Sequence, residues 1–286
     1  MTGPNLKHVT IIGAGLLGGS LGLALKRRCR GVHVAGVGRR EQSLQEAMDV
    51  GAIDSAHLDP AEPAAQSDLI ILATPVGSFE GYLRAIKPHL RPRTLVTDVG
   101  STKAQIVAAA SRVLGPAGPF VGSHPMAGSE LKGARFARED LFEDALCILT
   151  PTARTPAWAL ARTRQLWRAL GSRLVTMTPA AHDRALARVS HLPHALAALL
   201  MILPDDADLR VAGPGLRDMT RLAGGDAEVW RDIFMTNRQA LLDAIDHLDE
   251  DLMHLRDLIE AGAADEIERF LDFARRRRER HINGRS

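Results

Sequence analysis

The sequence predicts an α/β protein in which a mostly parallel sheet domain is followed by an all-helical domain. Short apolar runs alternate with helical stretches through the first half of the chain, and a glycine-rich hexamer follows the first apolar run. After Thr178 there is no strand-like run. Strands that alternate with helices form parallel sheets covered on both faces, because each crossover helix packs against the sheet.

Six apolar runs in the first half predict the strands of the sheet. They cover residues 9–12, 32–37, 69–73, 95–99, 120–123 and 146–150. After the first run, residues 16–28 have helical spacing, so that a strand–turn–helix unit opens the chain. This order of elements predicts a Rossmann-type domain over residues 1–178.

The second half changes from strands to helices at Thr178. This threonine precedes Pro179, as an N-cap residue precedes proline in a first helical turn. Helical patterns then fill residues 180–203, 226–259 and 264–280, and Pro193 should kink the first of these helices. We expect residues 179–286 to form an all-helical domain whose apolar faces suit dimerisation.

The composition argues against several classes of protein. The formal net charge of the 286-residue chain is +2, too close to neutral to predict nucleic-acid binding. The two cysteines, Cys29 and Cys147, are far apart, which predicts neither a disulfide framework nor a cysteine metal site. We find no signal peptide and predict no transmembrane helix or membrane partner, so that we expect a cytoplasmic protein.

The hexamer at residues 13–18 has the GxGxxG pattern of a dinucleotide-binding loop. In this pattern Gly13 permits a tight turn, Gly15 lets backbone N–H groups approach a pyrophosphate, and Gly18 lets the helix lie close to the strand. The phosphates then meet the positive end of the helix. The candidate cofactor-binding residues are Gly13, Gly15, Leu16, Leu17 and Gly18. The alternative is a glycine turn with a structural role only.

Two arginines stand where the choice between NAD and NADP is usually made. An acidic residue that holds a ribose 2′-hydroxyl is expected about 20 residues after the glycines. The chain instead has Arg39 and Arg40 there. Arginine pairs with a 2′-phosphate, so that the sequence favours NADP over NAD. Alternatively, both arginines are surface charges and NAD binds without the carboxylate.

Thr74 and Pro75 end the third predicted strand, at the edge of the sheet where ligands of open α/β folds bind. Two interpretations of this segment fit the sequence equally well. It contacts the adenosine side of the cofactor, or it only ends the strand.

Two segments with reactive side chains follow strands at the same edge. Residues 98–103 are DVGSTK, and residues 122–130 are GSHPMAGSE. Histidine is the side chain best suited to accept a proton near neutral pH. His124 therefore suggests hydride transfer coupled to deprotonation, with a structural histidine as the alternative.

These segments, with SHLPH at residues 190–194 and GLRDMTR at residues 215–221, resemble the prephenate/arogenate dehydrogenase family. The likeness runs from the first strand through WRDIF at residues 230–234 and into helices up to about residue 275. It implies oxidative decarboxylation of prephenate to 4-hydroxyphenylpyruvate in tyrosine biosynthesis, with hydride transfer to NAD or NADP. It also implies a homodimer formed through the helical domain.

The resemblance implies a role for seven residues. His124 would be the base toward the ring hydroxyl of the substrate, and Ser101 would assist it. The implied substrate-binding residues are Arg221 for a carboxylate, His194 beside the substrate side chain, Glu130 and Asp218 at a gate, and Trp230 from the partner subunit.

His194 bears on the choice between the two substrates of the family. It can donate a hydrogen bond to the keto acid of prephenate and is a poorer neighbour for the ammonium of arogenate, so that we favour prephenate. The alternatives are an arogenate dehydrogenase, another two-domain hydroxy or imino acid dehydrogenase, and a non-catalytic NADP sensor. We expect no metal at His182 and Asp183, because this redox chemistry needs none; Asp183 is expected to orient a histidine or to cap a helix.

Overall fold

The computed structural model describes residues 6–128 and 131–281, and the chain divides into two compact units, residues 1–238 and 239–286. The first unit holds the sheet and the helices that follow it as far as α11 (Ala227–Thr236). The second holds α12 (Arg238–Glu260), which begins at the division, and α13 (Ala264–His281).

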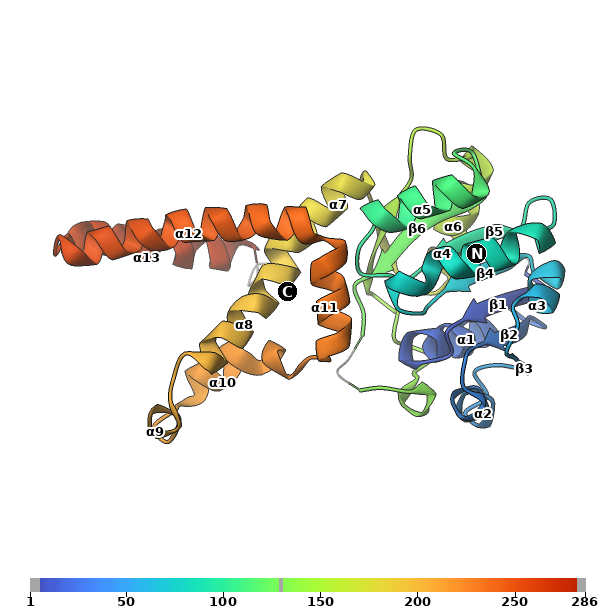
Figure 1. The fold of residues 1–286 in the computed structure, drawn as a ribbon, viewed down its shortest axis with the longest axis horizontal. Coiled ribbons are helices and arrows are strands. Elements are labelled where there is room, and N and C mark those ends of the chain that lie inside the picture. Colours follow the sequence, from blue (N-terminus) through green and yellow to red (C-terminus); the bar gives the residue numbers. More distant parts are fainter. Residues whose placement is uncertain (1–5, 129–130, 282–286) are drawn as a thin grey trace. The chain divides into compact units, whose positions relative to one another are not determined.

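An eight-stranded sheet forms the centre of the first unit (Figure 1). Its strands are β1 (His8–Ile12), β2 (His33–Val37), β3 (Ser55–His57), β4 (Leu69–Leu72), β5 (Leu95–Asp98), β6 (Phe120–Pro125), β7 (Leu146–Thr150) and β8 (Arg173–Thr176). They lie in the order β3-β2-β1-β4-β5-β6-β7-β8, and every neighbouring pair is parallel except β6 and β7. The predicted Rossmann-type, mostly parallel sheet is confirmed.

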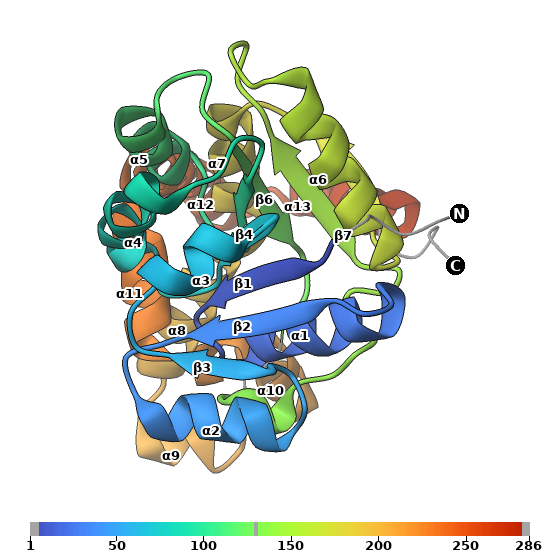
Figure 2. The same ribbon diagram turned by 90° about the vertical axis from the view of Figure 1, so that its right-hand side faces the viewer.

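Helices cover both faces of this sheet (Figure 2). One face packs against α1 (Leu16–Arg28), α2 (Glu41–Asp49) and α6 (Ala157–Ala169); the other packs against α3 (Ala61–Gln66), α4 (Phe79–Ile86) and α5 (Ala104–Leu114). The apolar side chains of β4 are fully buried, with Ile71 in the first core layer and Ile70 in the second. A sheet buried on both sides holds the ends of its strands at fixed positions, which is where the candidate site lies.

The two strands that the sequence did not predict lie at the edges of the sheet. β3 has three residues, none of them fully buried, and three of the four residues of β8 are exposed or nearly so. An edge strand needs no continuous apolar run, because solvent covers part of it. The apolar pattern that revealed the central strands was therefore missing at both edges.

Beyond β8 the first unit is helical, as predicted. Its helices are α7 (Pro179–Leu186), α8 (Leu192–Ile202), α9 (Asp206–Leu209), α10 (Pro214–Thr220) and α11, with a 3-10 turn at Arg221–Gly224. The Thr178 hydroxyl accepts a hydrogen bond from the backbone N–H of Ala181 at 3.2 Å, so that the predicted N-cap of α7 is confirmed.

Two predicted helices are interrupted. The run over residues 180–203 contains a π-helical turn at Ala187–His191 just before Pro193, which has no N–H to continue the ladder. The run over residues 226–259 ends at Thr236 and resumes at Arg238. Between them Asn237 is buried, and its side chain bonds to α7, so that a tertiary contact sets this break.

The domain boundary that we expect near residue 178 stays a prediction. The change from strand to helix falls there, between Thr176 of β8 and Pro179 of α7. The compact units instead divide at residues 238 and 239, because α7 and α11 contact the sheet domain through hydrogen bonds.

One helical run, Pro179–Ile202, is long and apolar enough to cross a membrane by length and composition alone. Its polar side chains argue against that role. His182, Asp183 and His191 are buried and hydrogen-bonded to other parts of the first unit. This run therefore contributes buried polar side chains to the candidate site of the first unit.

Candidate active site

The glycine loop joins the end of β1 to the start of α1. Gly13 has a φ of 104°, which disfavours any residue with a side chain. A Cβ on Gly18 would lie 1.9 Å from the Gly13 carbonyl oxygen, so that only glycine lets α1 approach the loop so closely. A Cβ on Gly15 would meet nothing within 4 Å, which leaves open space beside the N-terminus of α1.

This geometry fits a dinucleotide. The first turn of α1 carries no acidic residue that would repel phosphate, and the space beside Gly15 lets a pyrophosphate approach the backbone N–H groups. β1 and β4 are neighbours in the sheet, and this is where the order of strands reverses, the position at which ligands bind in such folds.

Thr74 lies beside the glycine loop, at the end of β4. A Cβ on Gly13 would come within 2.9 Å of the Thr74 Cγ2 atom. Pro75 follows and is exposed. The structure thus brings the predicted Thr74–Pro75 segment next to the loop, which suits a contact to the cofactor, although that role stays a prediction.

Arg39 and Arg40 follow β2 and are both exposed. Within residues 6–128 and 131–281, no carboxylate is paired with either side chain. Two unpaired guanidinium groups after the second strand are suited to bind a phosphate.

A buried ion pair anchors the second segment of the site. Asp98, the last residue of β5, pairs with Lys103, and neither side chain is exposed to solvent. The other contacts of the carboxylate are backbone N–H groups of Gly100 at 2.8 Å and Ser123 at 3.0 Å. Burial raises the pKa of Asp98 and lowers that of Lys103, and their mutual attraction opposes both shifts. The pair fixes the loop after β5 against β6.

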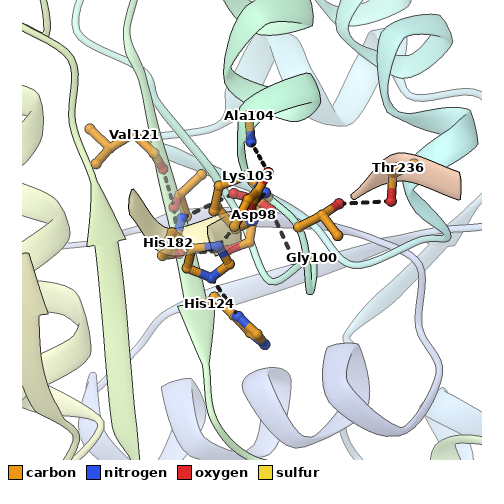
Figure 3. Close-up of polar contacts among 12 residues, drawn as sticks. Asp98, Gly100, Lys103, Ala104, Val121, His124, His182 and Thr236 are labelled. Atoms are coloured by element: carbon orange, nitrogen blue, oxygen red, sulfur yellow. Dashed lines mark hydrogen bonds and ion pairs between the residues drawn. The ribbon is translucent and has the colours of Figure 1, made fainter. Parts of the chain in front are cut away.

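His124 lies in β6, one strand further along the same edge, and only 8% of it is exposed. Its Nδ1 is 2.8 Å from Nε2 of His182 in α7 (Figure 3). His182 Nδ1 is in turn 2.7 Å from Oδ1 of Asp183. The carboxylate of Asp183 also accepts the backbone N–H groups of Lys103 and Ala104, both at 2.8 Å, and so caps α5. Asp183 thus contacts the neighbouring histidine as expected, but the helix whose start it caps is α5 and not its own helix α7.

His124 is suited to act as a base rather than as an acid. Burial, first of all, holds its pKa well below the ordinary value, and positive charge on His182, Lys103 or His191 would add to that effect. The imidazole is therefore neutral at neutral pH. Its Nε2 makes no hydrogen bond within the described parts of the chain.

Helix α11 is tied to the same cluster. The Asn237 side-chain amide donates to the Asp183 backbone carbonyl at 2.8 Å and to His191 Nδ1 at 3.0 Å. The Thr102 hydroxyl is hydrogen-bonded to that of Thr236 at 3.0 Å. Burial lowers the pKa of His191 to about 4, so that this histidine is a neutral structural acceptor.

His194 and Trp230 form a stacked pair, with ring centroids 3.2 Å apart and an interplanar angle of 18°. The resemblance implied a tryptophan donated by a partner subunit; here Trp230 stacks on His194 of its own chain. Gly225 makes room for the stack, since a Cβ there would come within 2.6 Å of Trp230 Nε1 and 2.8 Å of His194 Nε2. The His194 Nε2 atom is buried and has no hydrogen-bond partner among the described residues, and its predicted role beside the substrate stays a prediction.

The other predicted site residues make fewer contacts with His124 and His194. Arg221 begins the 3-10 turn after α10 and is exposed, and its charge contributes, after burial, to a lowered pKa of His194. Asp218 is exposed on α10. Ser101 is half-buried after β5, and no hydrogen bond joins it to His124 in the described structure. Glu130 lies outside the described residues.

Sequence reasoning did not identify His182 as the direct partner of His124, nor Asn237 and Gly225 as supporting residues. Asp98 and Lys103 were within the DVGSTK segment at the end of one predicted strand, but the sequence did not indicate that they form an ion pair. His182 stands next to Asp183 in the first turns of α7, and no local pattern points from there to residue 124.

A glycine loop at the reversal of strand order, with a buried neutral histidine at the same edge of the sheet, is the arrangement of a dinucleotide-dependent oxidoreductase. Comparison with known families makes the assignment specific. A family model described as "Prephenate dehydrogenase, nucleotide-binding domain" matches residues 21–176, and one described as "Prephenate dehydrogenase, dimerization domain" matches residues 178–273. The chain belongs to the prephenate dehydrogenase family.

Several relatives cover most of the chain. The prephenate dehydrogenase of Bacillus subtilis (strain 168) is 32% identical over 93% of this chain and 74% of its own length. The crystal structure of prephenate dehydrogenase from A. aeolicus with hydroxyphenyl propionate and NAD+ is 32% identical, with a TM-score of 0.90 over 96% of this chain and 98% of that one. The Synechocystis arogenate dehydrogenase structure is also 32% identical, with a TM-score of 0.84 over 96% of this chain and all of that one (100%).

Proposed function

We propose that this chain oxidatively decarboxylates prephenate to 4-hydroxyphenylpyruvate, in the biosynthesis of tyrosine. The observation that carries the proposal is the buried, neutral His124, whose Nε2 makes no hydrogen bond among the described residues and which lies at the same edge of the sheet as the glycine loop. The relatives named as prephenate dehydrogenases support it.

The residues around the glycine loop would hold the cofactor. Gly13, Gly15 and Gly18 would place the backbone of the loop and the start of α1 against the pyrophosphate, with Leu16 and Leu17 in the first turn of that helix. Thr74 and Pro75 would line the adenosine side. When bound, the nicotinamide supplies the hydride acceptor.

His124 would act on the hydroxyl of the substrate ring. Removing the hydroxyl proton to Nε2 raises the electron density on the carbon that loses hydride, which makes that loss easier. Departure of CO2 from the opposite carbon makes the ring aromatic and leaves a phenolate oxygen, to which His124 returns the proton. Aromatisation drives the reaction, so that the chain has mainly to orient the substrate and move one proton. Ser101 would help to position the hydroxyl.

The substrate has two carboxylates, and Arg221 supplies a positive charge for one of them. Arg221 would bind one of them bidentately. The Nε2 of His194, which has no hydrogen-bond partner in the described part of the chain, would face the keto acid side chain. Asp218 and Glu130 would control access, and Trp230 would hold the His194 ring in place. Since a histidine is a poor neighbour for an ammonium, prephenate is the preferred substrate. Arogenate is the second candidate, favoured by the likeness to the Synechocystis enzyme.

Cofactor reduction followed by absorbance tests the proposal directly. The purified chain is mixed with prephenate and, separately, with arogenate, in the presence of NAD or NADP. We expect reduction with prephenate at a kcat/KM well above that with arogenate. No reduction with either substrate would reject the proposed activity and leave a non-catalytic dinucleotide-binding protein, whereas a preference for arogenate would correct the substrate.

Replacing Arg221 with alanine should chiefly raise the KM for prephenate, because a carboxylate contact present in both ground state and transition state contributes to binding more than to kcat. A loss of about 1.5–3 kcal/mol, typical of a hydrogen bond to a charged group, corresponds to roughly a 10- to 150-fold rise in KM. Steady-state kinetics measure the effect, and Arg217→Ala on exposed α10 is the matched control. An unchanged KM would remove Arg221 from the substrate site.

The chain should prefer NADP to NAD, because Arg39 and Arg40 follow β2 and are paired with no carboxylate among the residues that the structure describes. The double variant Arg39→Ala/Arg40→Ala should lower kcat/KM for NADP by about ten-fold or more and change that for NAD little, since only NADP carries the 2′-phosphate. Arg91→Ala, a surface arginine elsewhere, serves as control. A strong preference of the unaltered chain for NAD would refute this expectation.

We also propose a cytoplasmic homodimer without nucleic-acid or membrane partners. The description of the second family model as a dimerization domain supports the dimer. Two buried free cysteines, Cys29 and Cys147, suit a reducing compartment.

A further inference from the structure

The side chain of Asp183 can only accept hydrogen bonds where it lies. Its Oδ1 takes the backbone N–H of Lys103, its Oδ2 takes the backbone N–H of Ala104, and only 3% of the residue is exposed. Both oxygens therefore act as acceptors at the N-terminus of α5. The atom of His182 that faces Oδ1, at 2.7 Å, must therefore carry a hydrogen.

That requirement settles the direction of the next hydrogen bond. A neutral imidazole has one N–H and one bare nitrogen. Since His182 Nδ1 carries the hydrogen, its Nε2 is bare and can only accept. The partner 2.8 Å away, Nδ1 of His124, must then be the donor (Figure 3). By the same rule, Nε2 of His124 is left bare.

We propose that His182 and Asp183 are positioning residues that hold His124 in the Nδ1–H tautomer, so that its Nε2 is the basic atom. The structure thus assigns a positioning role to His182 and Asp183 of α7, whereas the base, His124, lies in strand β6. The consequence for catalysis rests on the proposed function, in which Nε2 takes the proton of the substrate hydroxyl. The tautomer itself is a property of the free protein.

The charges around His124 agree with this assignment. His182 acts on His124 from α7, Lys103 from the loop after β5, and His191 from the π-helical turn. Asp183, the neighbour of His182, and Asp98, the last residue of β5, act on the His182 ring. Burial, first of all, lowers the pKa of His124 and of His182, so that both rings are neutral in the resting protein. When His124 gains a proton at Nε2, its Nδ1–H points at the bare nitrogen of His182. The carboxylate of Asp183 then stabilises positive charge on the pair.

The tautomer of His124 is measured by NMR on the full-length chain with ¹⁵N-labelled histidine at neutral pH, without substrate. Long-range ¹H–¹⁵N correlations distinguish a protonated Nδ1 from a protonated Nε2, and loss of one set of signals in His124→Asn assigns the residue. We expect the Nδ1–H form. A predominant Nε2–H form would overturn the proposal, whatever the chain does with prephenate. The Nδ1–H form in a protein that does not turn over prephenate would reject the proposed function and keep the proposal.

Two substitutions at His182 test what the pair does. In His182→Gln, the amide oxygen can stand where Nε2 stood and still accept from His124, whereas His182→Leu leaves no acceptor. We expect His182→Leu to lower kcat roughly 100-fold or more, within the range of acid–base contributions, with the Nδ1–H signal lost and the KM for the cofactor little changed. His182→Gln should keep the Nδ1–H signal and recover most of kcat. Equal kcat values for the two variants, at equal thermal stability, would show that His182 only fills space. If His182→Leu does not fold, the NMR result on the unaltered chain and on His182→Gln still decides.

Discussion

Replacing His124 with asparagine should lower kcat for prephenate by about 10²- to 10⁴-fold, the range of a lost general base, with a modest change in KM. The asparagine amide can donate to His182 Nε2 as Nδ1–H does, so that the hydrogen bond to α7 is kept. What is lost is the Nε2 atom, which the substrate hydroxyl would meet. Steady-state kinetics with prephenate and a saturating cofactor measure the effect.

A matched control is His33→Asn. His33 is an exposed histidine at the start of β2, at the opposite edge of the sheet from the glycine loop. Its replacement should leave kcat unchanged. An unchanged kcat in His124→Asn would remove His124 from the mechanism, and the unoccupied Nε2 would then need another explanation.

The pH dependence of the unaltered chain follows from the same residue. Since burial holds the pKa of His124 well below its ordinary value, the neutral base persists as the pH falls through the usual range of histidine titration. The acidic limb of kcat/KM, which reports the base in the free enzyme, should therefore lie below about pH 6.5. An acidic limb above that value would contradict a neutral, buried base.

Replacing Lys103 with methionine should destabilise the protein by about 3–5 kcal/mol, the cost of leaving one member of a buried ion pair without its partner. Asp98 is fully buried and would retain only the backbone N–H groups of Gly100 and Ser123. Those two donors compensate part of the charge, so that the lower end of the range is expected. Urea denaturation gives the change in the free energy of unfolding.

The double variant Asp98→Asn/Lys103→Met provides the control for this prediction. It removes both charges, so that it should be more stable than Lys103→Met alone if the unpaired carboxylate causes the loss. Equal stability of the two variants would assign the loss to packing of the lysine side chain instead. Wild-type stability of Lys103→Met would show that the pair contributes nothing.

The central part of the fold followed from local patterns. All six predicted strands are present. β1, β2, β4, β5, β6 and β7 are largely buried, so that each contains a run of apolar residues that the sequence reveals. The edge strands β3 and β8 need no such run and were not predicted. The helix over residues 226–259 was predicted as continuous, because its break depends on what Asn237 contacts and not on its neighbours in the sequence.

The sequence by itself determined that a glycine loop follows the first strand, that His124 comes directly after an apolar, strand-like run, and that helices follow Thr178. Each of these features depends on residues within one turn or one strand, so that spacing reveals it. Only the tertiary structure decided which nitrogen of His124 is basic. His124 and His182 are 58 residues apart, and a hydrogen bond between such residues depends on how α7 packs against the sheet, which no local spacing records. The same reason applies to Gly225, whose missing side chain makes room for His194 and Trp230.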